Sequence, residues 1–227
     1  MVTTLYSIPI SNYSAMARDI IYRNNLPVKI AAPADLGGLK SDAYLDKFPS
    51  GKMPALDVPA EKICLYESDV IINYLLPSID NRSRRGALNN LVSRIHDMYH
   101  GPHQSSLYRH VKSDQVRIDA ISAINFALDE YERILGELDD GPFFGGSSLG
   151  RGDLIYPTFA FYLHILPNYL DSEVFQSRTR LTRWWNAIKK DEICTRILHE
   201  MKGGFVEWED ADVFLKLYGR KCAVTFI

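Results

Sequence analysis

The chain has 227 residues, 46% of them hydrophobic and 24% charged, which is an ordinary composition for a soluble globular protein of one large or two smaller domains. Lys and Arg are scattered along a sequence whose formal net charge is −2, whereas a nucleic-acid-binding protein usually has a basic face. No run approaches the ~20 apolar residues of a membrane span, so neither nucleic acid nor membrane is an expected partner.

Residues 1–77 have the changing periodicity of a mixed α/β domain. The pattern begins with a strand at Thr4–Ile8, continues with a helix at Ser14–Asn24 and reaches a second strand at Val28–Ile30. Because a helix lies in the connection between these two strands, we expect them to be parallel.

A hairpin and a helix complete this half of the chain. Ser41 is a suitable cap for a short helix at 42–45. Two strand patterns at 54–57 and 63–66 are joined by a tight polar turn, which predicts an antiparallel pair. A helix is then expected at 68–75, where a following proline ends it.

From residue 87 onward, after a linker at 78–86, only helical patterns remain. Apolar side chains recur at spacings of three and four in two segments, namely Leu88, Leu91, Val92, Ile95, Met98 and Tyr99, and then Ile121, Ile124, Leu128, Tyr131, Leu135 and Leu138. Residues 154–166 are apolar on nearly every side, which indicates a buried helix that Pro157 bends or delays. The fold class is therefore α+β with two domains, a mixed N-terminal domain followed by an all-helical C-terminal domain.

Four short motifs occur in an informative order. Ser11-Asn12-Tyr13-Ser14 stands between the first strand and the first helix, and Gly51-Lys52-Met53-Pro54-Ala55-Leu56 runs into the hairpin. Glu67-Ser68 opens the next helix, and Gly150-Arg151-Gly152-Asp153 precedes the buried apolar helix. Each motif alone is weak, but the ordered set is specific.

The set resembles the N-terminal domain of soluble, cytosolic glutathione transferases. The likeness is carried by Leu5-Tyr6 followed by Ser11, by the GKMPAL run, and by Leu65-Tyr66-Glu67-Ser68 with Ile71, Tyr74 and Leu75. The resemblance implies a thioredoxin-like, glutathione-binding domain at 1–77, a linker at 78–86 and an all-helical bundle at 87–227. It also implies a cytoplasmic homodimer that conjugates the glutathione thiolate to small hydrophobic electrophiles, a detoxification activity.

The resemblance assigns six residues to glutathione, the co-substrate: Ser11, Lys52, Met53, Pro54, Glu67 and Ser68. Helix N-termini favour the anionic ends of this tripeptide. Ser68 would donate to the γ-glutamyl carboxylate and Glu67 would pair with the ammonium group, although the same pair also suits a simple helix cap. In the family, a cis bond before Pro54 presents the backbone of Met53 to the ligand and Lys52 lies near the glycyl end; the alternative is a trans proline that starts an edge strand.

Ser11 is the catalytic candidate. By its spacing from Leu5, it falls where serine-type (theta- and phi-like) members carry a serine whose hydroxyl donates to the glutathione sulfur and stabilises the thiolate. Asn12, Tyr13 and Ser14 are close enough to take this role instead, and Ser14 also suits a helix cap. Because the motif has no cysteine, it cannot form a mixed disulfide, and conjugation is favoured over thiol–disulfide exchange.

The electrophile is expected to contact the helical half. By the layout of the family, we assign its pocket to Tyr13, Tyr99, His103, Tyr108 and Arg109. His96, His100 and His103 have a spacing that also suits a metal site on one helix face, but Gly101 and Pro102 interrupt a regular helix there. We therefore expect glutathione and no metal.

Two departures from the family pattern keep other functions open. Phe48 stands where family members usually have Asn before Pro, and Gly150 replaces the Ser or Thr that forms a capping box with Asp153, whose role is in folding. The alternatives are a glutathione-dependent isomerase, for which the usual cysteine at the first helix is missing, and a non-catalytic glutathione-transferase-like module for protein assembly.

The cysteines and the N-terminus bear on the compartment. Cys64, Cys194 and Cys222 are far apart and have no CxxC spacing, which argues against a disulfide framework and a zinc knuckle. The N-terminal residues enter a strand pattern at once, without the charged and apolar regions of a signal peptide. We therefore expect a reducing, cytoplasmic location.

Overall fold

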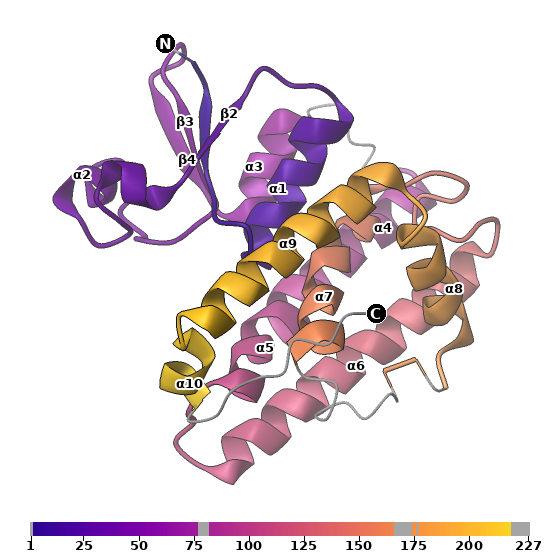
Figure 1. Cartoon of the computed structure of the whole chain (residues 1–227). Coiled ribbons are helices and arrows are strands. Elements are labelled where there is room, and N and C mark those ends of the chain that lie inside the picture. Colours follow the sequence, from indigo (N-terminus) through magenta and orange to yellow (C-terminus); the bar gives the residue numbers. More distant parts are fainter. Residues whose placement is uncertain (1, 77–81, 166–173, 176, 219–227) are drawn as a thin grey trace. The chain divides into compact units, whose positions relative to one another are not determined.

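The computed structural model describes residues 2–76, 82–165, 174–175 and 177–218 (Figure 1). The chain divides into two compact units. The first unit contains residues 1–79 and 196–204, and the second, helical unit contains residues 80–195 and 205–227. The boundaries expected from the sequence did not include the return of residues 196–204 to the first unit.

The first unit is built on a four-stranded, thioredoxin-like mixed sheet with the strand order β2-β1-β3-β4. Its strands are β1 (Thr4–Tyr6), β2 (Lys29–Ala31), β3 (Ala55–Val58) and β4 (Ile63–Tyr66). The predicted parallel pair β1/β2 and the predicted hairpin β3/β4 are both confirmed, and β3 also pairs with β1 in antiparallel fashion. The pairing places the C-terminal ends of β1 and β4 at the N-terminal end of β3.

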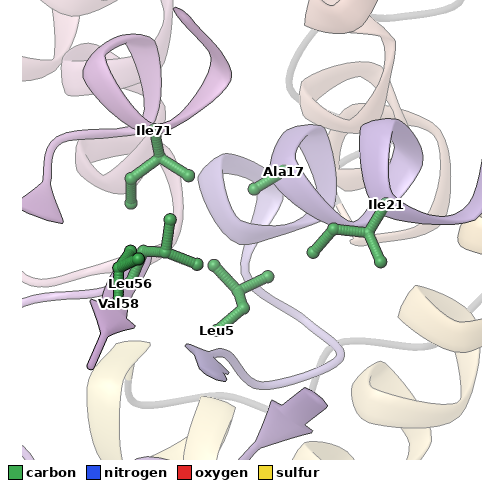
Figure 2. Close-up of a cluster of buried hydrophobic side chains, with 6 residues drawn as sticks. All are labelled: Leu5, Ala17, Ile21, Leu56, Val58 and Ile71. Carbon is green, nitrogen blue, oxygen red and sulfur yellow. The ribbon is translucent and has the colours of Figure 1, made fainter. Parts of the chain in front are cut away.

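Two helices, α1 (Asn12–Arg23) and α3 (Ser68–Leu75), cover one face of the sheet (Figure 1). Figure 2 shows the buried cluster between these helices and the sheet, which consists of Leu5, Ala17, Ile21, Leu56, Val58 and Ile71. Successive side chains of a strand point to opposite faces. Tyr6 and Ala55, the neighbours of Leu5 and Leu56, therefore join a second cluster on the other face.

Aromatic rings fill that second face, beside η1 (Pro33–Leu36) and α2 (Asp42–Leu45). The rings of Tyr6 and Phe48 are 5.6 Å apart between centroids, and those of Tyr44 and Phe48 are 5.0 Å apart. Phe48 is fully buried. The departure from the family pattern at this position thus adds apolar surface to the core, where an amide side chain would need hydrogen-bond partners.

Apart from one isolated β-bridge between Phe143 and Gly146, the regular elements in the described part of the second unit are all helices. Its helices are α4 (Arg84–Ile95), η2 (His96–His100), α5 (Gly101–Tyr108), α6 (Asp114–Leu138), η3 (Arg151–Ile155), α7 (Tyr156–Ile165), α8 (Thr179–Ile188), α9 (Glu192–Asp210), whose middle belongs to the first unit, and α10 (Val213–Tyr218). None of the helices within these ranges is both long enough and apolar enough to cross a membrane.

Serine caps shift two helix boundaries from their expected positions. α1 begins at Asn12 because the Ser11 hydroxyl accepts a hydrogen bond from the Ser14 amide, 3.2 Å away. α4 begins at Arg84, inside the expected linker, because the Ser83 hydroxyl accepts one from the Gly86 amide at 3.0 Å. Residues 78–81 of that linker and Leu166, the expected end of the apolar helix, lie outside the described residues.

Asp153 has the folding role that the sequence predicted. Its fully buried carboxylate accepts hydrogen bonds from the amides of Phe144 (2.9 Å), Gly145 (3.0 Å) and Gly150 (2.7 Å) and from the indole N–H of Trp184 (2.8 Å). The apolar segment then begins as η3, and Pro157 lies in the first turn of α7, where its missing N–H is harmless. Proline therefore delays the α-helix.

Candidate active site

The candidate site lies where three connections meet at one end of the sheet. Tyr6, the last residue of β1, pairs with Ala55, the first residue of β3, and Ala55 pairs in turn with Tyr66, the last residue of β4. The segments 7–11, 51–54 and 67–68 adjoin these three residues. The register therefore places at the same end of the sheet the three segments that carry the predicted glutathione residues: Ser11, Lys52, Met53, Pro54, Glu67 and Ser68.

Ser11 lies at the N-terminus of α1. Its backbone is extended (φ −73°, ψ 111°), and its half-buried hydroxyl accepts the Ser14 amide. Within the described part of the chain, the Ser11 hydroxyl proton has no acceptor. It is available to donate to a ligand at a helix end where backbone N–H groups already favour negative charge.

Two of the three neighbours of Ser11, Asn12 and Ser14, are more buried than Ser11. Ser14 is fully buried, and its hydroxyl has no hydrogen-bond partner among the described residues. Asn12 is 9% exposed, and Tyr13 is half-buried. A ligand arriving from solvent reaches Ser11 more readily than Ser14, which the sequence had left as an alternative.

The second connection is held by a buried tyrosine of α2. The Tyr44 hydroxyl donates to the Lys52 carbonyl over 2.7 Å, and burial raises the pKa of Tyr44 to about 12, so this donor keeps its proton at neutral pH. The peptide bond between Met53 and Pro54 is cis, which is the isomer expected from the resemblance and not the alternative trans isomer. Lys52 is exposed, Met53 is half-buried and Pro54 is buried.

A second lysine adjoins this connection. The Lys40 ammonium nitrogen would lie only 3.2 Å from a Cβ built on Gly51, a residue with a φ of +58°. Sequence reasoning missed Lys40 and Tyr44 because both precede the motif by several residues and contact it only through the fold. Their one local signal was the Ser41 cap, which starts the helix that carries Tyr44.

The third connection is strained at Glu67. This residue has a φ of +72°, in a region that side chains other than glycine rarely adopt, and such strain is concentrated at functional sites. Glu67 is exposed and makes no capping bond with its side chain. Ser68, the first residue of α3, is 7% exposed. The simple helix-cap interpretation of Glu67 therefore finds no support in its side chain.

The residues assigned to the electrophile pocket belong to both units. Tyr13 lies in α1 of the first unit, whereas Tyr99 in η2, His103 in α5 and Arg109 after α5 belong to the helical unit. Tyr99 is 43% exposed, and its ring lies 5.0 Å from that of Phe126, edge to face. The Tyr108 side chain is outside the described part of the chain. The pocket itself stays a prediction.

Two histidines of the helical unit are engaged by hydroxyl groups. The His96 ring nitrogen Nε2 lies 2.7 Å from the Thr158 hydroxyl, and the His100 ring nitrogen Nδ1 lies 3.3 Å from the Tyr131 hydroxyl. Both histidines are buried, whereas His103 is half-buried on the next helix. Among the described residues, no group of three or more His, Cys, Asp and Glu side chains is arranged to hold a metal ion.

Comparison with protein families matches residues 5–82 to the family model described as Glutathione S-transferase, N-terminal domain. This match runs from Leu5 in β1 through α3 and includes all three connections of the candidate site. No curated protein matches the chain.

Several solved structures share the fold of this chain over most of its length. Glutathione transferase F2 from Populus trichocarpa is 23% identical, with a TM-score of 0.69, covering 89% of this chain and 100% of its own. The Tau class glutathione S-transferase MiGSTU from mango is 20% identical, with a TM-score of 0.72, covering 91% and 97%. Glutathione S-transferase-I bound with lactoylglutathione is 15% identical, with a TM-score of 0.66, covering 88% and 100%.

Proposed function

We propose that this protein is a serine-type glutathione transferase, which conjugates the glutathione thiolate to small hydrophobic electrophiles. One observation carries the proposal. The strand register sets the segments that carry Ser11, the cis Met53–Pro54 peptide and the strained Glu67 at one end of the sheet, and the Ser11 hydroxyl, which accepts the Ser14 amide, has no acceptor for its own proton among the described residues. The stability of a helix or hairpin requires neither this free proton nor the cis peptide nor the strain at Glu67, whereas a bound peptide with charged ends would use each of them.

The chemistry of glutathione suits this end of the sheet. Its γ-glutamyl group carries a carboxylate and an ammonium, which match the Ser68 hydroxyl at the start of α3 and the Glu67 carboxylate. Its backbone would pair with the N–H and C=O of Met53 as an added strand. Its glycyl carboxylate would lie near Lys52 of the second connection and Lys40, which adjoins it. One of the similar solved structures is bound with lactoylglutathione, which supports glutathione as the ligand.

Ser11 would act on the sulfur. A free thiol titrates near ~8.5, and both a helix N-terminus and a donated hydrogen bond favour its thiolate. The thiol proton leaves to solvent, the sulfur forms a bond to the electrophilic carbon, and the leaving group departs with its electron pair. The small apolar electrophile, the homodimer and the cytoplasmic location stay part of the proposal, because they follow from the family alone.

The decisive test is calorimetric titration of glutathione into wild type and Ser11→Ala, with thiolate absorbance measured on the same samples. We expect both proteins to bind glutathione and the mutant to lose the thiolate signal, with kcat for a chloronitroarene falling about a hundredfold. Turnover of an isothiocyanate gives a second electrophile for the same comparison.

Ser83→Ala is the matched control, because Ser83 also caps a helix by accepting a backbone amide. Both substitutions remove about 1 kcal/mol of capping, but only Ser11→Ala should change the thiolate. An equal loss of thiolate absorbance and kcat in both variants would mean that Ser11 acts only as a helix cap. Failure of the wild type to bind glutathione would overturn the proposal in favour of the non-catalytic assembly module.

A further inference from the structure

The segment that leads to Ser11, residues 7–10, is held by hydrogen bonds from one guanidinium group. Arg18 lies on α1 and is 3% exposed. It donates to the Ser7 hydroxyl (2.5 Å), to the Ile8 carbonyl (2.8 Å) and to the Pro9 carbonyl (2.8 Å). Three consecutive residues between β1 and α1 thus converge on one side chain. The planar, five-donor fork of arginine can hold such a set, whereas the ammonium of lysine cannot span it.

The contact extends to Ser11 through a shared acceptor. The Ile8 carbonyl that accepts from Arg18 also accepts the backbone N–H of Ser11, at 3.2 Å. The position of this carbonyl fixes where α1 begins and hence where the Ser11 hydroxyl lies. A displacement of Ile8 is therefore transmitted to the catalytic candidate across one hydrogen bond.

The α9 segment of the first unit holds Arg18 in turn. The Glu200 carboxylate lies 3.1 Å from the Arg18 guanidinium and neutralises its buried charge. One turn further along α9, a Cβ built on Gly204 would lie 2.9 Å from the Ile10 backbone nitrogen, closer than real Cβ atoms approach. Only glycine at this position allows α9 to lie so close to the residue before Ser11.

We propose that Arg18 is a positioning residue for the Ser11 hydroxyl, held in place by Glu200 and Gly204 of α9. The proposal rests on the proposed function for the role of Ser11, but the fastening of residues 7–10 has its own consequences. A misplacement of about 1 Å costs up to about a hundredfold in rate. Catalysis should therefore respond to Arg18 although Arg18 does not touch the substrate.

The test replaces Arg18 by lysine in the full-length protein, which keeps the charge near Glu200 and removes the fork. We expect kcat to fall about tenfold to a hundredfold while KM for glutathione changes less than about threefold. The pKa of the bound glutathione thiol, read from thiolate absorbance against pH, should rise by about one unit, the equivalent of one weakened hydrogen bond. Amide hydrogen exchange in residues 7–11 should accelerate.

Arg196→Ala is the matched control. Arg196, on α9, is a second guanidinium that contacts Glu200, at 3.3 Å, and it lies over the ring of Tyr22 on α1 at 3.6 Å. We expect it to leave kcat and the thiol pKa unchanged. Glu200→Gln, which keeps the side-chain shape, should show a weaker form of the Arg18→Lys effect and covers the case in which Arg18→Lys does not fold.

The outcomes separate the two proposals. Unchanged kcat, thiol pKa and exchange in both Arg18→Lys and Glu200→Gln would overturn the positioning role. The same losses in Arg196→Ala would overturn it too, because they would come from general weakening of the contact with α9. If the wild type forms no thiolate, the proposed function fails, and the exchange rates of residues 7–11 still decide whether Arg18 fastens this segment.

Discussion

His100 is a fully buried histidine whose ring faces the imidazole of His96 and the hydroxyl of Tyr131. Burial, with a smaller contribution from His96, lowers its pKa well below 6.5. The unfolded chain therefore binds a proton that the native protein does not bind as the pH falls below about 6.5. The contribution of this group to stability is complete above that pH and is lost on acidification.

We expect His100→Gln to remove this pH dependence. Relative to the variant, the wild type should lose about 1–1.5 kcal/mol of unfolding free energy between pH 7.5 and 5.5. Urea unfolding followed by tryptophan fluorescence measures it, since Trp184, Trp185 and Trp208 all belong to the helical unit. The plots of unfolding free energy against pH for the two proteins should run parallel above pH 7. If they also run parallel at acidic pH, the pH dependence does not come from His100.

Only the difference between the two proteins is informative, because Asp153 acts with the opposite sign. Burial raises its pKa to about 6, although its four N–H donors oppose the shift. The native protein therefore takes up a proton there between about pH 6 and 4, before the unfolded chain does, and gains stability as the pH falls. In the wild type alone, this gain partly hides the loss at His100.

At the scale of elements, the two adjacent glycines of α9 have opposite roles. Gly203 is exposed, and a Cβ there would meet nothing within 4 Å, whereas Gly204 is buried against Pro9 and Ile10. Glycine inside a helix costs about 0.5–1 kcal/mol relative to alanine. Neither position has a positive φ, so the difference between them is one of space alone.

Gly203→Ala should therefore stabilise the protein by about 0.5–1 kcal/mol. Gly204→Ala gains the same helix propensity, but its added methyl group would clash with the Ile10 backbone. We therefore expect a net destabilisation of about 1–3 kcal/mol. Calorimetric melting of both variants under identical conditions tests the pair. Equal stabilisation by both substitutions would show that α9 and residues 9–10 can move apart at no cost.

The elements that the sequence located best are those defined by local signals. The predicted bounds of α3 and β4 agree with the structure, because a proline, a polar turn and a serine mark their ends. Ser11 became the catalytic candidate through its spacing from Leu5 and the family resemblance, and that spacing did not show that it is the cap of α1. The capping role follows from backbone geometry, which the sequence pattern leaves open by one or two residues.

The parts of the site that the sequence did not predict depend on long-range pairing. Arg18 and Glu200 belong to different halves of the chain, and no spacing connects them. The helical pattern of α1 predicts apolar side chains at its buried positions. An arginine such as Arg18 at one of them is an exception, since charged residues are rarely buried unless they are paired. Phe48 likewise looked like a loss of a family residue until its ring was found inside the core.

At the scale of the whole molecule, the two units are not two consecutive pieces of chain. α9 begins and ends in the helical unit, and its middle, residues 196–204, belongs to the first unit. Residues 1–82, which include the part that matches the family model (5–82), therefore lack one of their own packing elements. A domain of this size has a stability of only about 4–12 kcal/mol, so the missing contacts matter.

We expect a fragment of residues 1–82 to be stabilised by a peptide of residues 192–210 added in trans. The peptide restores the Glu200 carboxylate beside Arg18 and the Arg196 guanidinium over the Tyr22 ring. These two contacts together should contribute about 1–3 kcal/mol of stability. Trp208 is the only tryptophan in the mixture, so its fluorescence anisotropy reports binding directly. The control peptide carries Glu200→Lys, which places a like charge beside the buried guanidinium and should bind at least tenfold more weakly, a difference of about 1.4 kcal/mol. Equal binding of the two peptides would mean that apolar packing alone recruits α9, and that the Arg18–Glu200 pair adds nothing to the first unit.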